Sequence, residues 1–277
     1  MPKRIRLGFS PCPNDTFIFA GLVLGRVPTS FTPDIFLADV EELNQRALKG
    51  EPDATKVSVG VLPRILDEYI ILSSGAALGF GCGPLLAARE DLDPNELRFE
   101  PVAVPGLMTT ANLLLSLYGH AGPRVEMSFE RIIPAVASGL HRAGLVIHEG
   151  RFTFAARGLR KILDLGEWWE EWTNSPLPLG VIVMKRSLGL GAILEMEAAI
   201  RTSLEFSRKN PALAAPYIRD KAQEMDPAVL TRHIETFVTD YSLDLGPVGR
   251  EAVRELTDMG RVSQGLSPFD KPLFLDG

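Results

Sequence analysis

Short apolar segments that stop abruptly at polar residues or glycine recur along this chain, and most of them lead into a helical pattern. Strands are expected at residues 4–9, 52–60, 69–73, 98–104 and 144–147, the last of them fully buried. Strands that alternate with helices are typical of α/β folds. In open α/β sheets ligands bind beyond the carboxyl ends of the strands, so the polar residues at these ends are the first candidates for a functional site.

His148 and Glu149 follow directly after the apolar segment 144–147. A histidine at a strand end is placed to meet a small molecule. Because an imidazole has an ordinary pKa of about 6.5, it can exchange a proton near neutral pH. A structural histidine held by hydrogen bonds is an equally good interpretation of this segment alone.

Two further strand ends carry polar side chains. Lys56 and Ser58 alternate onto one face of the second strand, where an ammonium and a hydroxyl would suit a substrate carboxylate. A solvent-exposed lysine beside a serine is the alternative. Thr109 and Thr110 begin a helical segment, where hydroxyls and free N–H groups converge. Helix capping explains one of these threonines, and the second weakly indicates a ligand.

The first strand leads into a rigid polar turn, residues 10–16. Asn14 or Asp15 is expected to cap a helix that runs toward Leu24. Free N–H groups at such a helix start can bind an anion, although a simple capped turn explains the sequence as well. Cys12 has no adjacent His or Lys in the sequence, which disfavours a thiol nucleophile.

Two apolar segments predict a pair of hinge strands. The glycine-rich residues 75–84 lead into the first, 85–89, and residues 179–186 form the second. We therefore expect a larger α/β lobe from residues 1–88 and 186–277, and a smaller α/β lobe from residues 89–185. Helices are expected at residues 159–172, 193–208, 213–224, 227–240 and 248–259.

Composition excludes several classes of function. The chain has 277 residues and a formal net charge of −6, which disfavours a nucleic-acid partner. It shows neither a signal-peptide pattern nor an apolar run long enough to span a membrane. Two cysteines without a histidine cluster do not make a zinc site. We expect a cytoplasmic protein with reduced cysteines and no metal, and the sequence does not predict its oligomeric state.

Several segments together resemble the 1,4-dihydroxy-6-naphthoate synthase family of the futalosine pathway of menaquinone biosynthesis. They are LGFSPCPNDTFIF at residues 7–19, TKVS at 55–58, VPGLMTTA at 104–111, AGLVIHEGRFT at 143–153 and LPLG at 177–180. The resemblance covers nearly the whole chain. It implies the fold of type II periplasmic binding proteins, which have two α/β lobes, two hinge strands and a ligand cleft between the lobes.

The resemblance also implies an activity. The family converts cyclic dehypoxanthinylfutalosine to 1,4-dihydroxy-6-naphthoate and releases a small sugar-derived fragment, dihydroxyacetone, without a cofactor. By position, its proton acceptor falls on His148. Its substrate-binding segments fall on Lys56, Val57 and Ser58, and on Thr109, Thr110 and Ala111. Glu149 is a candidate to orient His148 because the two are adjacent.

Two other functions are compatible with such a fold. One is a carboxylate-binding protein without catalytic activity, since a fold does not fix a function. The other is the sibling chorismate dehydratase of the same pathway. The missing signal-peptide pattern disfavours a transport receptor, and the match around His148 disfavours the dehydratase.

Overall fold

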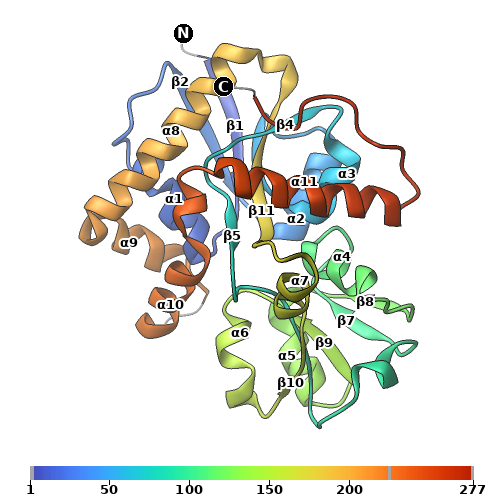
Figure 1. Ribbon diagram of the computed structural model, residues 1–277. Helices are drawn as coiled ribbons and strands as arrows, with labels where there is room; N and C mark the ends of the chain where they lie inside the picture. Colours follow the sequence, from blue (N-terminus) through green and yellow to red (C-terminus); the bar gives the residue numbers. More distant parts are fainter. Residues whose placement is uncertain (1–2, 224–225, 276–277) are drawn as a thin grey trace.

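The computed structural model describes residues 3–223 and 226–275 and shows two lobes, each built around one β-sheet (Figure 1). Both sheets combine parallel and antiparallel pairs and are flanked by helices. The expected α/β class and the two-lobed arrangement are therefore confirmed.

The sheet of the first lobe has the strand order β2-β1-β3-β11-β4, and β5 also pairs with β11. Its strands are β1 (Lys3–Phe9), β2 (Phe31–Leu37), β3 (Ala54–Ser58), β4 (Tyr69–Ile71), β5 (Ala77–Gly79) and β11 (Leu177–Lys185). β1 pairs in parallel with β2 and β3, whereas β11 is antiparallel to β3, β4 and β5. The carboxyl ends of β1 and β3 therefore lie at the same edge of this sheet.

Seven α-helices belong to the described part of the first lobe. They are α1 (Pro13–Val23), α2 (Val40–Leu48), α3 (Leu62–Ile65), α8 (Leu190–Lys209), α9 (Pro211–Lys221), α10 (Pro227–Phe237) and α11 (Gly246–Ser263). The four helices expected after residue 186 are present, with ends shifted by a few residues. Glu224, the expected last residue of one of them, lies outside the described residues.

The expected cap of α1 is wrong. The N-cap residue is Cys12, with Pro13 in the first turn, and no side chain caps this helix. Proline fits the first turn because the N–H group that it lacks has no intrahelical partner there. Asp15 instead accepts hydrogen bonds from the N–H and hydroxyl of Ser10, so its carboxylate turns away from the helix N–H groups.

The sheet of the second lobe has the order β10-β6-β9-β7-β8. Its strands are β6 (Leu85–Ala88), β7 (Val102–Val104), β8 (Arg124–Glu126), β9 (Ala143–Val146) and β10 (Arg160–Asp164), and its helices are α4 (Thr110–Leu117), α5 (Phe129–Ala137), α6 (Gly150–Thr153) and α7 (Leu165–Thr173). β7 is parallel to β8 and β9, so the carboxyl ends of β7 and β9 also share an edge.

The single helix expected at residues 159–172 is wrong. Residues 160–164 form β10, and α7 starts at Leu165. The side chain of Asp164 accepts hydrogen bonds from the N–H groups of Gly166 and Glu167 at 2.9 and 3.2 Å. This cap fixes the helix start, so the preceding residues are free to pair with β6.

Strand pairing also differs from the expected lobe boundaries. β6, expected in the larger lobe, pairs within the second sheet, and β11, expected in the smaller lobe, pairs within the first. The chain therefore crosses between the lobes near residues 80–84 and 174–176, where β5 and the start of β11 run side by side. At one crossing a Cβ on Gly83 would lie 2.3 Å from the Cα of Gly166, so only glycine fits this close approach.

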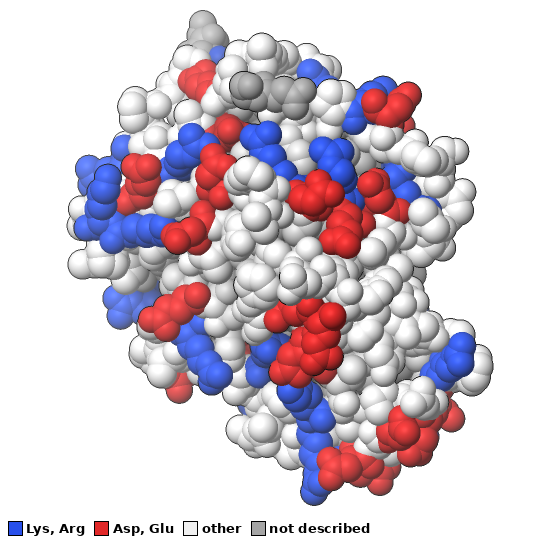
Figure 2. Space-filling view, viewed as in Figure 1, with Lys and Arg blue, Asp and Glu red and all other residues white. Residues whose placement is uncertain are grey.

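Positive and negative side chains are interspersed on the face shown in Figure 2. This face shows no broad basic surface of the kind that binds nucleic-acid backbones. Among the described helices, none is both long and apolar enough to cross a membrane.

Candidate active site

A cavity lies between the lobes, at the carboxyl ends of parallel strands from both sheets. Its lining comes from the turn after β1, from β3, from the start of α4 after β7, and from the turn after β9. All seven residues singled out from the sequence line it: Lys56, Val57, Ser58, Thr109, Thr110, Ala111 and His148. The structure thus brings together groups from three distant segments, and their roles stay predictions.

His148 stands at the turn that follows β9, in a strained backbone conformation. Its φ angle is 53°, in the left-handed region, which costs a residue with a side chain about 1–2 kcal/mol. Such strain persists where surrounding structure enforces it, and it is common at functional sites. The imidazole packs against the ring of Phe129, with centroids 5.0 Å apart. The turn therefore holds the ring at the cavity wall.

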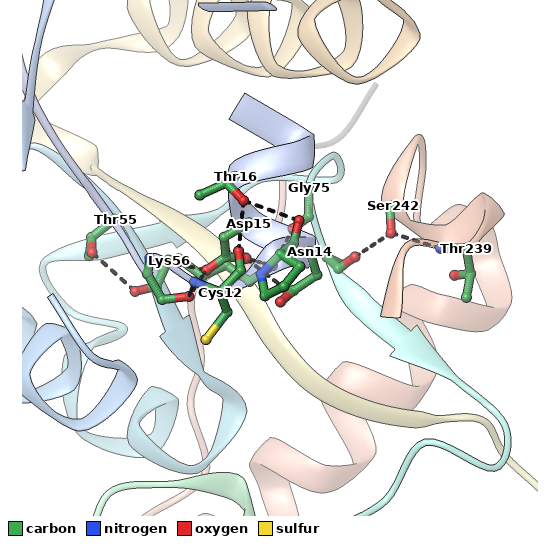
Figure 3. A network of polar contacts seen from close by, with 12 residues as sticks. Cys12, Asn14, Asp15, Thr16, Thr55, Lys56, Gly75, Thr239 and Ser242 are labelled. Carbon is green, nitrogen blue, oxygen red and sulfur yellow. Dashed lines mark hydrogen bonds and ion pairs between the residues drawn. The ribbon is translucent and has the colours of Figure 1, made fainter. Parts of the chain in front are cut away.

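Lys56 is buried and makes both a hydrogen bond and an ion pair, which the sequence did not indicate. Its ammonium donates a 2.6 Å hydrogen bond to the carbonyl of Gly75 and lies 3.3 Å from Oδ1 of Asp15. Both side chains of this ion pair are buried. Figure 3 shows Lys56 on β3 and Asp15 on α1 converging in one polar network. The alternative that Lys56 is exposed to solvent is therefore wrong. Asp15 and the Gly75 carbonyl balance its positive charge within the protein.

The two threonine hydroxyls at the start of α4 already have acceptors. The Thr109 hydroxyl donates to the carbonyl of Gly106 at 2.8 Å, and the Thr110 hydroxyl donates to the carbonyl of Leu179 at 2.6 Å. The first N–H groups of a helix have no intrahelical partner. Those of Thr110 and Ala111 donate to no other described group, so they are the free donors at this end of the cavity.

Ser58 adds a hydroxyl to the same region. Asn44 on α2 holds it from behind, because the Asn44 amide donates to the Ser58 hydroxyl oxygen at 3.2 Å and accepts from the Ser58 N–H at 2.9 Å. The hydroxyl hydrogen of Ser58 has no described acceptor and is available to a ligand. Ser58 and the start of α4 together offer neutral donors for an anionic group.

The lobes contact each other closely around the cavity. A Cβ on Gly60 of the first lobe would lie 2.6 Å from the carbonyl oxygen of Thr109 of the second. Glu41 of the first lobe accepts a 3.2 Å hydrogen bond from the N–H of Met108. Burial raises the pKa of the Glu41 carboxyl above its ordinary value. The cavity is therefore in a closed arrangement.

Cys12, His148 and Glu149 form the one group of potential metal donors found among the described residues. One candidate donor atom from each lies within 4.8 Å of the others. Burial raises the pKa of the Cys12 thiol well above its ordinary value. A metal binds the thiolate, which this environment disfavours, so the trio fits proton chemistry better than metal binding.

Sequence reasoning missed His233, which lies on α10 and is fully buried. Its ring is nearly parallel to that of His148, with centroids 6.1 Å apart, and its Nε2 lies 2.9 Å from Oδ1 of Asn14. Burial lowers the pKa of His233 to about 3, so it is neutral near pH 7. The sequence carried no signal for it beyond an amphipathic helix.

Arg151 was also missed. It lines the cavity, and its guanidinium bonds to the carbonyl of Gly83 and, at 2.8 Å, to Asp164. Because Gly83 lies at a crossing between the lobes, Arg151 ties the cavity wall to the hinge.

Fold and site together define a two-lobed protein of the type II periplasmic-binding-protein-like class. A Candida albicans protein described as having the generic periplasmic binding protein fold matches with a TM-score of 0.68 over 100% of this chain and 99% of its own, at 12% identity. A crystal structure of an Archaeoglobus fulgidus protein matches with a TM-score of 0.89 at 35% identity, over 95% and 98% of the two chains.

The chain belongs to the menaquinone biosynthesis family, whose model matches residues 5–261. Two curated relatives are each named 1,4-dihydroxy-6-naphthoate synthase. The Thermus thermophilus protein is 46% identical and covers 99% of this chain and 100% of its own length. The Streptomyces coelicolor protein is 45% identical, with 95% of each chain covered. The expected family is confirmed, and the relatives are named as enzymes.

Proposed function

We propose that this chain is a carbon–carbon lyase that converts cyclic dehypoxanthinylfutalosine to 1,4-dihydroxy-6-naphthoate and releases dihydroxyacetone. The observation that carries the proposal is the position of His148. A ring nitrogen of this second-lobe histidine lies within 4.8 Å of Cys12 of the first lobe, so the imidazole stands inside the closed cleft. The names of the two curated relatives support the product.

His148 acts as the general base. The substrate carbonyl acidifies a neighbouring C–H bond, and the neutral imidazole takes that proton. The electrons left on carbon then drive expulsion of the sugar-derived fragment, and the remaining ring becomes aromatic. The fragment leaves with a negative charge, and the protonated His148 can return the proton to it. Protons and electrons therefore balance without an oxidant or reductant.

The substrate carboxylate binds at the start of α4. The free N–H groups of Thr110 and Ala111 and the hydroxyl of Ser58 are its donors. A helix N-terminus carries a partial positive charge, which suits a carboxylate. The ammonium of Lys56 is already bound to Asp15 and Gly75, so Lys56 contributes as part of the cavity wall. Val57 and Ala111 supply apolar wall for the aromatic ring.

We also propose that the protein works in the cytoplasm as a small-molecule enzyme. Support comes from Cys12 and Cys82, which are both buried and unpaired, as in a reducing compartment.

The test is incubation of the purified protein with cyclic dehypoxanthinylfutalosine, with products identified by chromatography and mass spectrometry. We expect 1,4-dihydroxy-6-naphthoate and dihydroxyacetone in equal amounts. Chorismate is the control substrate, and its conversion to an enolpyruvyl benzoate would point to the sibling enzyme. Binding of the naphthoate without any turnover would favour the carboxylate-binding protein.

A further inference from the structure

The carboxyl group of Glu149 stands between two imidazoles. One of its oxygens lies within 4.8 Å of a ring nitrogen of His148, and Oε2 lies 3.8 Å from Nδ1 of His233. Glu149 and His148 belong to the second lobe, whereas His233 belongs to α10 of the first. The arrangement therefore depends on the closed lobes.

The hydrogen bonds of Asn14 fix the tautomer of His233. The Asn14 amide nitrogen donates to Oδ1 of Asp15 at 3.0 Å, so the Asn14 carbonyl oxygen faces His233. Because that oxygen can only accept, Nε2 of His233 must carry the hydrogen. Since the ring is neutral, Nδ1 is left as a bare acceptor that points toward Glu149.

Two buried acceptors thus face each other. Oε2 of Glu149 and Nδ1 of His233 both lack a hydrogen-bond partner and are shielded from solvent. A buried polar atom without a partner has lost its hydrogen bonds to water and gained none in the protein, which is unfavourable. Two acceptors cannot pair unless one of them carries a proton. The gap of 3.8 Å is too short for an intervening water. It exceeds the usual upper limit of a hydrogen bond, about 3.2 Å, so the two side chains must move closer by roughly 0.6 Å to share a proton.

Neither atom receives a hydrogen bond from the charged and titratable groups around the pair, which include His148 and, across the neighbouring pocket, Glu130 and Arg157. Cys12 approaches Glu149 from the turn before α1, and Asp15 lies behind Asn14. Arg232 on α10 is directed to the ring of Phe152, 4.7 Å from its centroid. None of these described groups bonds to Oε2 of Glu149 or to Nδ1 of His233.

We propose that Glu149 and His233 share one proton in the closed protein, so that His148 faces a neutral carboxylic acid instead of a carboxylate. The consequence is electrostatic. A carboxylate beside an imidazole favours the protonated imidazolium, which cannot act as a base. A neutral neighbour leaves His148 free to accept the substrate proton. His233 is therefore a residue that tunes His148 without touching substrate, and this role rests on the proposed lyase function.

The test is the pH profile of kcat/KM for four proteins: wild type, E149Q, H233F and the double variant E149Q/H233F. The amide of E149Q donates to Nδ1 of His233 and cannot ionise. The acid midpoint, the pH at which kcat/KM falls to half its maximum on the acid side, should therefore stay within a few tenths of a pH unit of wild type. H233F keeps an aromatic ring beside Phe152 and Phe237 but removes the acceptor, so Glu149 ionises. Its acid midpoint should rise by at least about one pH unit.

The double variant supplies the decisive comparison. It shares any packing defect of H233F but has no carboxyl group at position 149. Its acid midpoint should return to the wild-type value. An H233F midpoint equal to that of wild type would overturn the proposal, and so would a shift that persists in the double variant. Thermal unfolding of each variant confirms that it is folded before its kinetics are compared.

A second measurement does not depend on activity or on a folded H233F. In ¹⁵N-histidine NMR spectra of the wild type, His233 should show a protonated Nε2 and an Nδ1 that accepts a hydrogen bond, and the Nδ1 signal should move to that of a free acceptor in E149L. An unchanged Nδ1 signal would contradict proton sharing. Absence of naphthoate production by the wild type would contradict the proposed function instead. The NMR result would still show whether Glu149 and His233 share a proton.

Discussion

The hydroxyl of Thr110 donates a 2.6 Å hydrogen bond to the carbonyl of Leu179, and this bond joins the second lobe to β11 of the first. The same hydroxyl oxygen accepts a 3.2 Å hydrogen bond from the N–H of Gly60. One side chain thus satisfies two backbone groups of the opposite lobe. The backbone N–H groups of Thr110 and Ala111 line the cavity, so lobe closure and ligand binding both depend on Thr110.

Replacing Thr110 by valine should therefore weaken the closed state. Valine keeps the shape of threonine but leaves the Leu179 carbonyl and the Gly60 N–H unpaired, at a cost of about 1–3 kcal/mol. We expect kcat/KM to fall by roughly 5-fold to 100-fold, mainly through KM. The matched control is T110S, which keeps the hydroxyl. If the valine variant had the same kinetics as the serine variant, the Thr110 hydrogen bonds would not contribute to lobe closure.

Lys56 and Asp15 form a buried ion pair, so breaking it should destabilise the protein. K56M leaves the Asp15 carboxylate without its cation, and loss of one partner of a buried pair typically costs about 3–5 kcal/mol. Urea unfolding measures this loss. The double variant K56M/D15N should recover part of the stability because no uncompensated charge remains. If K56M unfolded like the wild type but bound the naphthoate much more weakly, Lys56 would instead be a direct ligand of the carboxylate.

The two thiols should react slowly in the folded protein. Burial, with the nearby charge of Glu170, raises the pKa of Cys82 to about 12 from its ordinary 9.0, and that of Cys12 is also raised. Because the thiolate is the reactive form, alkylation of Cys82 by iodoacetamide at pH 8 should be roughly a thousandfold slower than in denaturant. Peptide mass spectrometry follows each cysteine separately. Equal rates in the native and unfolded protein would contradict the buried positions.

The strand ends were predictable from the sequence because local pattern determines them. An apolar run that stops at Ser58 or before His148 places these residues at the carboxyl edge of a sheet, whatever the rest of the chain does. The two lobes followed from the resemblance and from the hinge pattern. The cavity lining was therefore largely visible in the sequence.

Partners that come from distant helices were not predictable. His233 and Asn14 are separated by 219 positions, and no periodicity indicates that a buried face of α10 meets the first turn of α1. The pairing of Lys56 with Asp15 has the same origin. The lobe boundaries were misplaced because an apolar strand can bond to either sheet, and only backbone pairing decides between them.

Steady-state kinetics of wild type and H148A, combined with their dissociation constants for 1,4-dihydroxy-6-naphthoate, test the central claim most directly. General base catalysis typically contributes at least about a hundredfold, so kcat of H148A should fall by that factor or more. The dissociation constant should stay nearly the same, because the carboxylate binds at Ser58 and the start of α4. Turnover by H148A at the wild-type rate would contradict the assignment of His148 as the base.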